Sequence, residues 1–360
     1  MNRYKFKFFL LLSFTFLLFS CGKDSNSSGG FSPKPIAYGK TNQLVIIADD
    51  DIWEGAVGDS LRYYYGGPYL ILPQPESIFD LKHYNARDIT VEPLRKELSA
   101  YIILANLNDT DSPVTQMVMK DIGAENVRRS KEDPSYNCPL SRDRWAKKQL
   151  VFYQFGWSHN QLIENIVDNF PVVSKKIENN YKQNIEATVY YAGTNKTLVR
   201  EVKEKMDADI RVPADYIQAV SDGEIIWLRR NTKKQKSSLL FKRIPYTNKE
   251  QLTKEGIKAI RNELTGEYIS SPEEGSYVKI NDVDLPMFTS VKTIDGNYVL
   301  EARGIWEMEN AYMAGPFISY LIYNKNKKDL LFIDGFVLAP SKAKRDFMQQ
   351  MELILNTVKY

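Results

Sequence analysis

Cysteine and histidine are almost absent from this sequence. Its 360 residues include two cysteines, Cys21 and Cys138, and two histidines, His83 and His159. Neither histidine stands in a spaced ligand motif, so zinc sites and histidine-based acid–base catalysis have no sequence support. Once Cys21 is assigned to another role, as argued below, Cys138 has no partner for an intramolecular disulfide. We expect Cys138 to be an unpaired, unreactive thiol.

Signatures of nucleotide, metal and serine-hydrolase chemistry are also missing. The sequence contains no G-x-G-x-x-G, P-loop, G-x-S-x-G or paired-cysteine motif. We therefore predict no cofactor and no metal, and we assign no catalytic residue. Three successive acids, Asp49 to Asp51, follow an apolar run, but they lack calcium-loop spacing and are better explained as the start of a helix.

The charge balance gives no indication of a nucleic-acid partner. The chain has 48 basic and 45 acidic residues, a formal charge of +3. The first 20 residues contain three of the basic residues and no acid, so the remainder has 45 of each sign. A neutral chain does not favour binding to nucleic acid.

The apolar run near the start is too short to span a membrane. Phe8–Phe19 has twelve residues, whereas a transmembrane helix needs about 20. Three basic residues precede the run, as in a secretory signal peptide, which we place at residues 1–20. Ser20-Cys21 ends the run, and the segment resembles the bacterial lipobox. The resemblance implies cleavage before Cys21 and its lipidation; the alternative is a secreted protein whose first residue is cysteine.

Residues 21–41 are rich in serine, glycine and proline, which predicts a flexible tether. Several acyl chains on Cys21 would hold the protein to a membrane without a spanning segment. Gly22 replaces the aspartate of the inner-membrane retention signal, so we expect the outer membrane of the cell envelope. Whether the protein faces the periplasm or the cell surface stays open.

The apolar patterns predict an α+β fold with two mixed or antiparallel sheets and packed helices. We place one α+β domain at residues 42–209 and a second, with a β-meander and a C-terminal helix, at 210–360. Each half ends in a strand followed by an amphipathic helix, which leaves open that they are two similar α+β units. Ser158 should begin a helix that Pro171 interrupts.

Tryptophan, arginine and glycine occur together in the second half. Arg303 and Trp306 flank a glycine in a predicted strand, and Phe317 follows shortly after. Trp227 and Arg229 share an earlier strand. Glycine within a strand often marks a close approach, and tryptophan and arginine are common binding anchors. These five residues are our candidate binding site; the alternative is core packing with arginines at strand edges.

Seven motifs resemble a lipoprotein family of Bacteroides-type bacteria, known as domain of unknown function 4837. In order, they are IWEGAVGDSLR, LPQPES, RDRWAKKQLVFY, WLRR, EEGSY, ARGIWEMENAYMAGPF and GFVLAPSKAKRDFMQQMELIL. The resemblance extends from about Asn42 to the end of the chain. It implies an exported lipoprotein and carries no activity, substrate or catalytic residue.

These observations favour a non-enzymatic, lipid-anchored envelope protein that binds another envelope component, either a protein or a glycan. The alternative is a carboxylate-dependent hydrolase acting on an envelope polymer. That reading requires two carboxylates in one cleft, one of them with a raised pKa. A scaffold without any ligand is a third reading.

Overall fold

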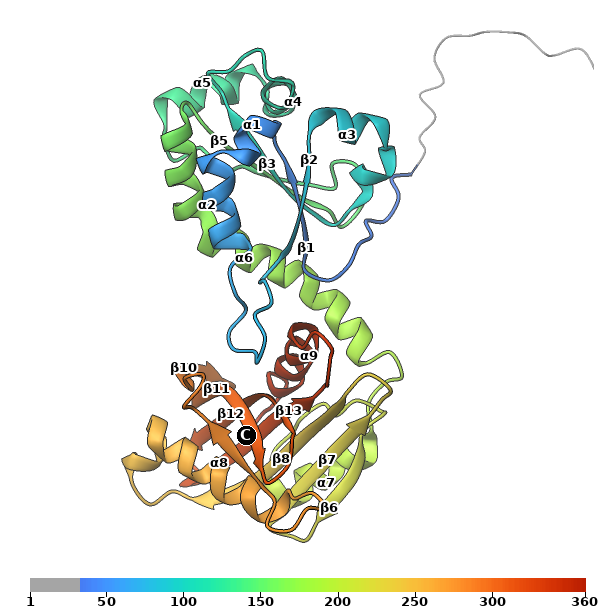
Figure 1. Cartoon of the computed structure of the whole chain (residues 1–360), viewed down its shortest axis with the longest axis vertical. Helices are drawn as coiled ribbons and strands as arrows, with labels where there is room; N and C mark the ends of the chain where they lie inside the picture. Colours follow the sequence, from blue (N-terminus) through green and yellow to red (C-terminus); the bar gives the residue numbers. More distant parts are fainter. Residues whose placement is uncertain (1–32) are drawn as a thin grey trace, which may run out of the picture. The chain divides into compact units, whose positions relative to one another are not determined.

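The computed structural model describes residues 33–360, which form two β-sheets and the helices that accompany them (Figure 1). The predicted signal peptide, Cys21 and most of the predicted tether lie outside the described residues. At the end of the predicted tether, Ile36 and Tyr38 form β-bridges with Lys147 and Leu98. Within the described range, no helix combines the length and apolar character needed to cross a bilayer.

The first sheet has five strands in the order β2-β1-β3-β5-β4. Four are parallel and the short β4 at the edge is antiparallel to β5, so the sheet is mixed. Apolar cores cover both of its faces, which explains why the central strands are continuously apolar. The strands are β1 (Gln43–Ile47), β2 (Asp80–Tyr84), β3 (Ala100–Asn106), β4 (Leu140–Arg142) and β5 (Leu150–Gly156).

Short helices and one long helix accompany this sheet. They are α1 (Asp50–Glu54), α2 (Ala56–Tyr65), α3 (Ala86–Val91), the 3-10 turn η1 (Pro93–Glu97), α4 (Pro113–Ile122), α5 (Ala124–Glu132) and α6 (His159–Val189). Ser158 caps α6 as predicted, accepting from the backbone N–H of Gln161. The predicted break at Pro171 was wrong, because α6 continues through it. Buried residues before and after Pro171, including Ile166 and Val173, share one core, and their packing outweighs the lost hydrogen bond.

The second sheet is antiparallel, with seven strands in the order β10-β11-β12-β13-β8-β7-β6 and β9 also paired to β11. Its predicted hairpin at Asp295-Gly296 is confirmed, with positive φ at both residues. The strands are β6 (Ile217–Ser221), β7 (Ile225–Asn231), β8 (Lys236–Pro245), β9 (Tyr277–Asn281), β10 (Phe288–Ile294), β11 (Asn297–Glu309), β12 (Ala314–Asn324) and β13 (Asp329–Leu338). The helices are α7 (Lys196–Met206), the 3-10 turn η2 (Lys249–Leu252), α8 (Lys254–Tyr268) and α9 (Arg345–Leu355).

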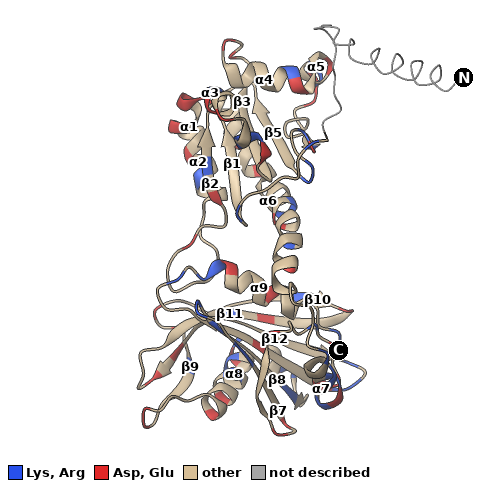
Figure 2. Cartoon of the chain, turned by 90° about the vertical axis from the view of Figure 1, so that its right-hand side faces the viewer, with Lys and Arg blue, Asp and Glu red and all other residues tan. Residues whose placement is uncertain are grey.

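Alternating side chains give the second sheet two buried faces. Leu300, Phe317 and Phe332 pack with α8 on one face, which we call the α8 face. Val299 and Ile333 pack with α7 and α9 on the other, the α9 face. Figure 2 shows α8 and α9 on opposite sides of β11 and β12. A residue's position along its strand therefore decides which core it joins.

The predicted α+β fold with two sheets is confirmed. The two sheets differ in strand direction and order, so the suggested likeness of the two units does not extend to their topology. The domain boundary near residue 210 stays a prediction.

Candidate functional site

Four of the five candidate residues lie on the α8 face of the second sheet. Arg229 of β7 stands opposite Ser238 of β8, and Ser238 stands opposite Phe336 of β13. The same row continues to Phe317 of β12 and Gly304 of β11. Trp227 and Trp306 lie two positions from this row on their own strands, so they share its face. Pairing of the strands therefore brings Trp227 and Trp306, about 80 positions apart in sequence, to the same face of the sheet.

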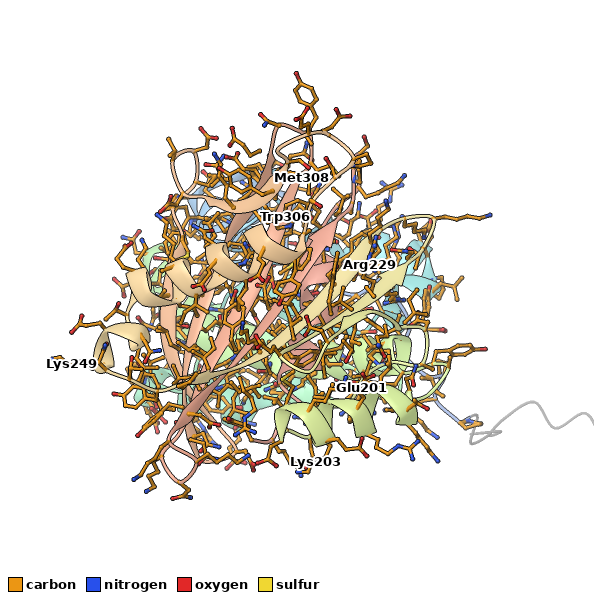
Figure 3. All side chains as sticks on the ribbon, turned by 90° about the horizontal axis from the view of Figure 1, so that it is seen from below. Glu201, Lys203, Arg229, Lys249, Trp306 and Met308 are labelled. Atoms are coloured by element: carbon orange, nitrogen blue, oxygen red, sulfur yellow. The ribbon has the colours of Figure 1, made fainter. Side chains whose placement is uncertain are left out.

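A cavity of about 330 Å³ opens beside this row. Its lining includes Trp227, Arg229 and Trp306, so the structure brings together three of the candidate residues. Figure 3 shows Arg229, Trp306 and Met308 toward one side of the second sheet. The remaining lining comes from the strands, from the segment after α8 and from the β11–β12 turn: Lys236, Ser238, Ile269, Ser270, Ser271, Pro272, Met308, Met313, Phe336 and Leu338.

Phe317 does not line the cavity; it is buried beside it and packs against Arg261. Its ring needs Gly304 opposite, because a Cβ there would come within 2.8 Å of the ring. Gly315 has the same role for Trp306, since a Cβ would lie 3.1 Å from the indole nitrogen and 2.0 Å from the Val337 carbonyl oxygen. Gly304, the strand glycine between Arg303 and Trp306, therefore marks a close approach, as predicted.

The two tryptophans present hydrogen-bond donors that remain unused. Trp306 is only 2% exposed and packs edge-on against Phe336, with ring centroids 5.8 Å apart. Among the described residues, neither its Nε1 nor that of Trp227 finds an acceptor. A buried indole N–H normally has a partner. Both side chains line the cavity, but both Nε1 atoms are covered from solvent, so a ligand acceptor would reach them only after a local shift.

Two cations at the cavity have no anionic partner. Neither Arg229 nor Lys236 forms an ion pair within residues 33–360, and the Arg229 guanidinium lies 5.2 Å from the centre of the Trp227 ring. No aspartate or glutamate belongs to the lining. Lys236 pairs with Asn231, two residues beyond Arg229, so the two cations are diagonal neighbours on the same face. The cavity therefore carries uncompensated positive charge.

A buried ion pair lies beside the cavity. Arg261 of α8 is 1% exposed and its Nε donates to Asp334 of β13, which is 0% exposed, over 3.0 Å. Ser319 also donates to Asp334, over 2.6 Å, and the guanidinium lies 3.9 Å from the Phe317 ring centre. Burial lowers the pKa of Arg261. Sequence reasoning missed this pair, although Arg261 falls four residues after the buried Ile257, on the apolar stripe of α8.

Arg303 lies on the opposite, α9 face and is engaged there. It donates to Glu301 and to the Tyr69 hydroxyl, and its Nη2 lies 2.7 Å from Glu352 of α9. Burial alone would raise the pKa of Glu301, but Arg303 and Lys292 outweigh it and hold the pKa of that carboxyl below its ordinary value. Arg303 and Trp306 are three positions apart on the strand, an odd number, so their side chains point to different faces.

A second cavity, of about 260 Å³, is lined by Glu178 of α6 and Glu352 of α9. Burial raises the pKa of Glu178, and the charge of Glu352 raises it further. This is the arrangement that the hydrolase alternative requires. Glu352, however, is already paired with Arg303.

The predicted helix start at Asp49 to Asp51 is found in part. Asp50 and Asp51 lie in the first turn of α1, where acids complement the helix dipole. Asp49 instead accepts a hydrogen bond from Ser112, and burial raises its pKa. Across the part of the chain that the structure describes, no three acidic, histidine or cysteine side chains are placed to hold a metal ion.

Fold and site together define a two-sheet α+β protein with an aromatic, positively charged cavity. Residues 195–357, which contain this cavity, match the model of the family described as domain of unknown function (DUF4837), and the predicted resemblance is confirmed there. Residues 37–190 match a different model, domain of unknown function (DUF8532). The match to the predicted family therefore covers the last four motifs of the sequence, and the first three fall within the second model.

Among solved structures, the chain is similar to the Ran-binding protein Mog1p of Saccharomyces cerevisiae. The identity is 11%, covering 42% of this chain and 89% of that one, with a TM-score of 0.29. A mutant of the protein Mog1 gives 12% identity, the same coverages and a TM-score of 0.30. TM-scores this low do not establish a shared fold. A comparison with curated proteins gives no match.

Proposed function

We propose that this protein is a lipid-anchored component of the cell envelope that binds another envelope component through the α8-face cavity. The observation that carries the proposal is the grouping of Trp227, Trp306 and Arg229 around one concave site. Aromatic side chains and arginine dominate binding hot spots. An apolar pocket with a few convergent polar groups is the usual form of a ligand site.

The cavity lining supports binding rather than catalysis. It contains no aspartate, glutamate, histidine or cysteine, so the serine hydroxyls of Ser238, Ser270 and Ser271 have no carboxylate or imidazole base in the lining. Its polar groups are suited to holding an acceptor in place. We therefore assign the cavity a recognition role.

Variants of the two more exposed anchors test this proposal in intact cells of the native host. The protein, tagged after Tyr360, is crosslinked and its partner identified. We expect one stoichiometric envelope partner, with recovery reduced about tenfold or more by Trp227→Ala or Arg229→Gln, as for hot-spot residues. Trp306→Ala is unsuitable because emptying a site that is 2% exposed costs about 3–5 kcal/mol of stability.

The matched control is Arg200→Gln on α7, which packs in the other core and should leave recovery unchanged. Equal recovery by Arg229→Gln, Trp227→Ala and the wild type would contradict the proposal. The hydrolase alternative draws support from Glu178 and its raised pKa. It predicts that the protein is recovered alone, and that Glu178→Gln reproduces the phenotype of a deletion strain.

A further inference from the structure

We infer that the α8-face cavity binds the free C-terminus of a partner peptide that ends in an apolar residue. This inference rests on the proposed binding function and names the chemistry of the ligand. The terminal carboxylate would lie at Arg229 and Lys236, and the last side chain would enter the apolar part of the cavity.

The charge of the site calls for an anion. Arg229 and Lys236 are diagonal neighbours on the α8 face, and no acid in the lining offsets them. Among residues 33–360, the side chain of Arg229 has a single recorded partner, the Trp227 ring. The planar guanidinium fork matches a carboxylate in a bidentate arrangement. A carboxylate between the two cations could contact both side chains and would offset one of the two positive charges.

The hydrogen-bonding groups call for an acceptor. Arginine, lysine and indole nitrogens can only donate. The Nε1 atoms of Trp227 and Trp306 also lack acceptors within the described chain, but both are covered from solvent, so Arg229 and Lys236 are the donors that a ligand meets first. A carboxylate has only acceptor oxygens, so it complements this set. A neutral sugar would bring hydroxyl donors, for which the lining side chains offer only serine hydroxyls as strong acceptors.

The size and walls of the cavity limit what accompanies the carboxylate. Its volume of about 330 Å³ is at the low end of the range for ligand sites, which is about 300–1,000 Å³. Phe336, Leu338 and Ile269 make part of the lining apolar, and Met308 and Met313 are flexible side chains that adapt to different shapes. The end of a chain can enter such a space, whereas a folded surface cannot. A peptide terminus presents an apolar side chain next to a carboxylate.

The test measures binding of short labelled peptides to the full-length chain in detergent by fluorescence anisotropy. The probes are N-terminally labelled Gly-Ser-Gly-Ser peptides extended by Phe, Leu or Val, each with a free carboxylate or a C-terminal amide. We expect at least one free acid to bind about tenfold more tightly than its amide, the effect of a charge-assisted hydrogen bond. Arg229→Gln should remove most of this preference, and Arg200→Gln should keep it.

Thermal unfolding of both variants verifies that they are folded. Equal affinity for acids and amides, or no saturable binding of any probe, would overturn the inference. Tighter binding of decanoate than of every peptide would also overturn it, because the ligand would then be a fatty acid. If the peptides fail while Arg229→Gln still loses its partner in cells, only the ligand class is wrong. If both experiments fail, the proposed binding function is wrong as well.

Discussion

The ion pair of Arg261 with Asp334 lies near the cavity and buries two charged side chains. Both side chains are buried, at 1% and 0% exposure, and each depends on the other for charge compensation. Asp334→Asn keeps the size of the side chain and removes its charge, leaving an uncompensated guanidinium between Phe317 and Phe336. We expect a loss of about 3–5 kcal/mol in the free energy of unfolding, measured by denaturant titration.

Asp295→Asn is the control for this prediction. Asp295 is exposed at the β10–β11 hairpin with φ +50°, a conformation that asparagine also accepts. We expect a change within about 0.5 kcal/mol, as for surface substitutions. Equal stability of the Asp334 and Asp295 variants would show that the buried pair contributes little.

Individual residues differ in how far the sequence could reveal them. Trp227 and Trp306 could be singled out as candidates from residue type, because tryptophan near arginine is a common binding anchor, but their shared α8 face could not be predicted. Arg261 and Asp334 could be inferred in principle, since each interrupts an apolar pattern. Their partnership could not, because 73 residues separate them and only the packing of α8 on β13 brings them together.

At the scale of elements, β11 places residues of the candidate site on one face and a buried ion-pair network on the other. Trp306 faces the cavity, while Glu301 and Arg303 face α9, where Glu301 also contacts Lys292 at 2.7 Å. The pKa of Glu301 is lower in the folded chain than its ordinary value. Its ionised form therefore stabilises the fold above the unfolded pKa, and this contribution is lost as the pH falls through the folded pKa.

Glu301→Gln should remove this acid-dependent contribution. At pH 7 we expect the variant to be about 3 kcal/mol less stable, since a buried ion-pair partner is lost. Below about pH 4, near the ordinary glutamate pKa, the difference from the wild type should shrink. The measurement is the unfolding free energy from pH 7 to pH 3.

Glu132→Gln provides the control, because Glu132 is exposed at the end of α5. It should follow the wild-type profile. Glu178 has the opposite sign: its raised pKa gives a contribution that is present at low pH and lost as pH rises. The wild type and Glu301→Gln both contain Glu178, so its contribution cancels when their unfolding free energies are compared. A stability difference that does not vary with pH would contradict the assigned role of Glu301.

The positions of strands and helices were predictable from periodicity. Which side chains lie on the α8 face and which on the α9 face was not. The five candidate residues came from two short stretches and were expected to act together. Whether they do depends on parity along β11, which separates Arg303 from Trp306, and on the register of four strand pairs. Pro171 shows the same limit, because tertiary packing along α6 overrides the local preference of proline.

At the scale of the whole molecule, the proposed anchor depends on one residue outside the described range. Cys21→Ser should move the protein from the membrane fraction to the soluble fraction of lysed cells, because several acyl chains would supply the membrane attachment. Fractionation followed by immunoblotting measures the shift. Cys138→Ser is the matched control and should stay with the membrane. Retention of Cys21→Ser in the membrane fraction would exclude Cys21 as the necessary anchor.

Cys138 suits this control because burial raises its pKa to about 12, so it is not a reactive thiol at neutral pH.

The α+β class was predictable because alternating and helical patterns recur along the whole chain. The parallel arrangement of the first sheet was less accessible, since β1 pairs with β2 and β3 across long connections. Local patterns identify strands, whereas pairing across such distances is decided by the shared core.

The Arg261–Asp334 pair also has a consequence for heating. Hydration of charged groups becomes less favourable as temperature rises, so keeping two ions dry costs less in a warm protein. Stabilisation by apolar burial levels off over the same range. The cost of keeping this pair buried between α8 and the second sheet should therefore fall as the protein is warmed.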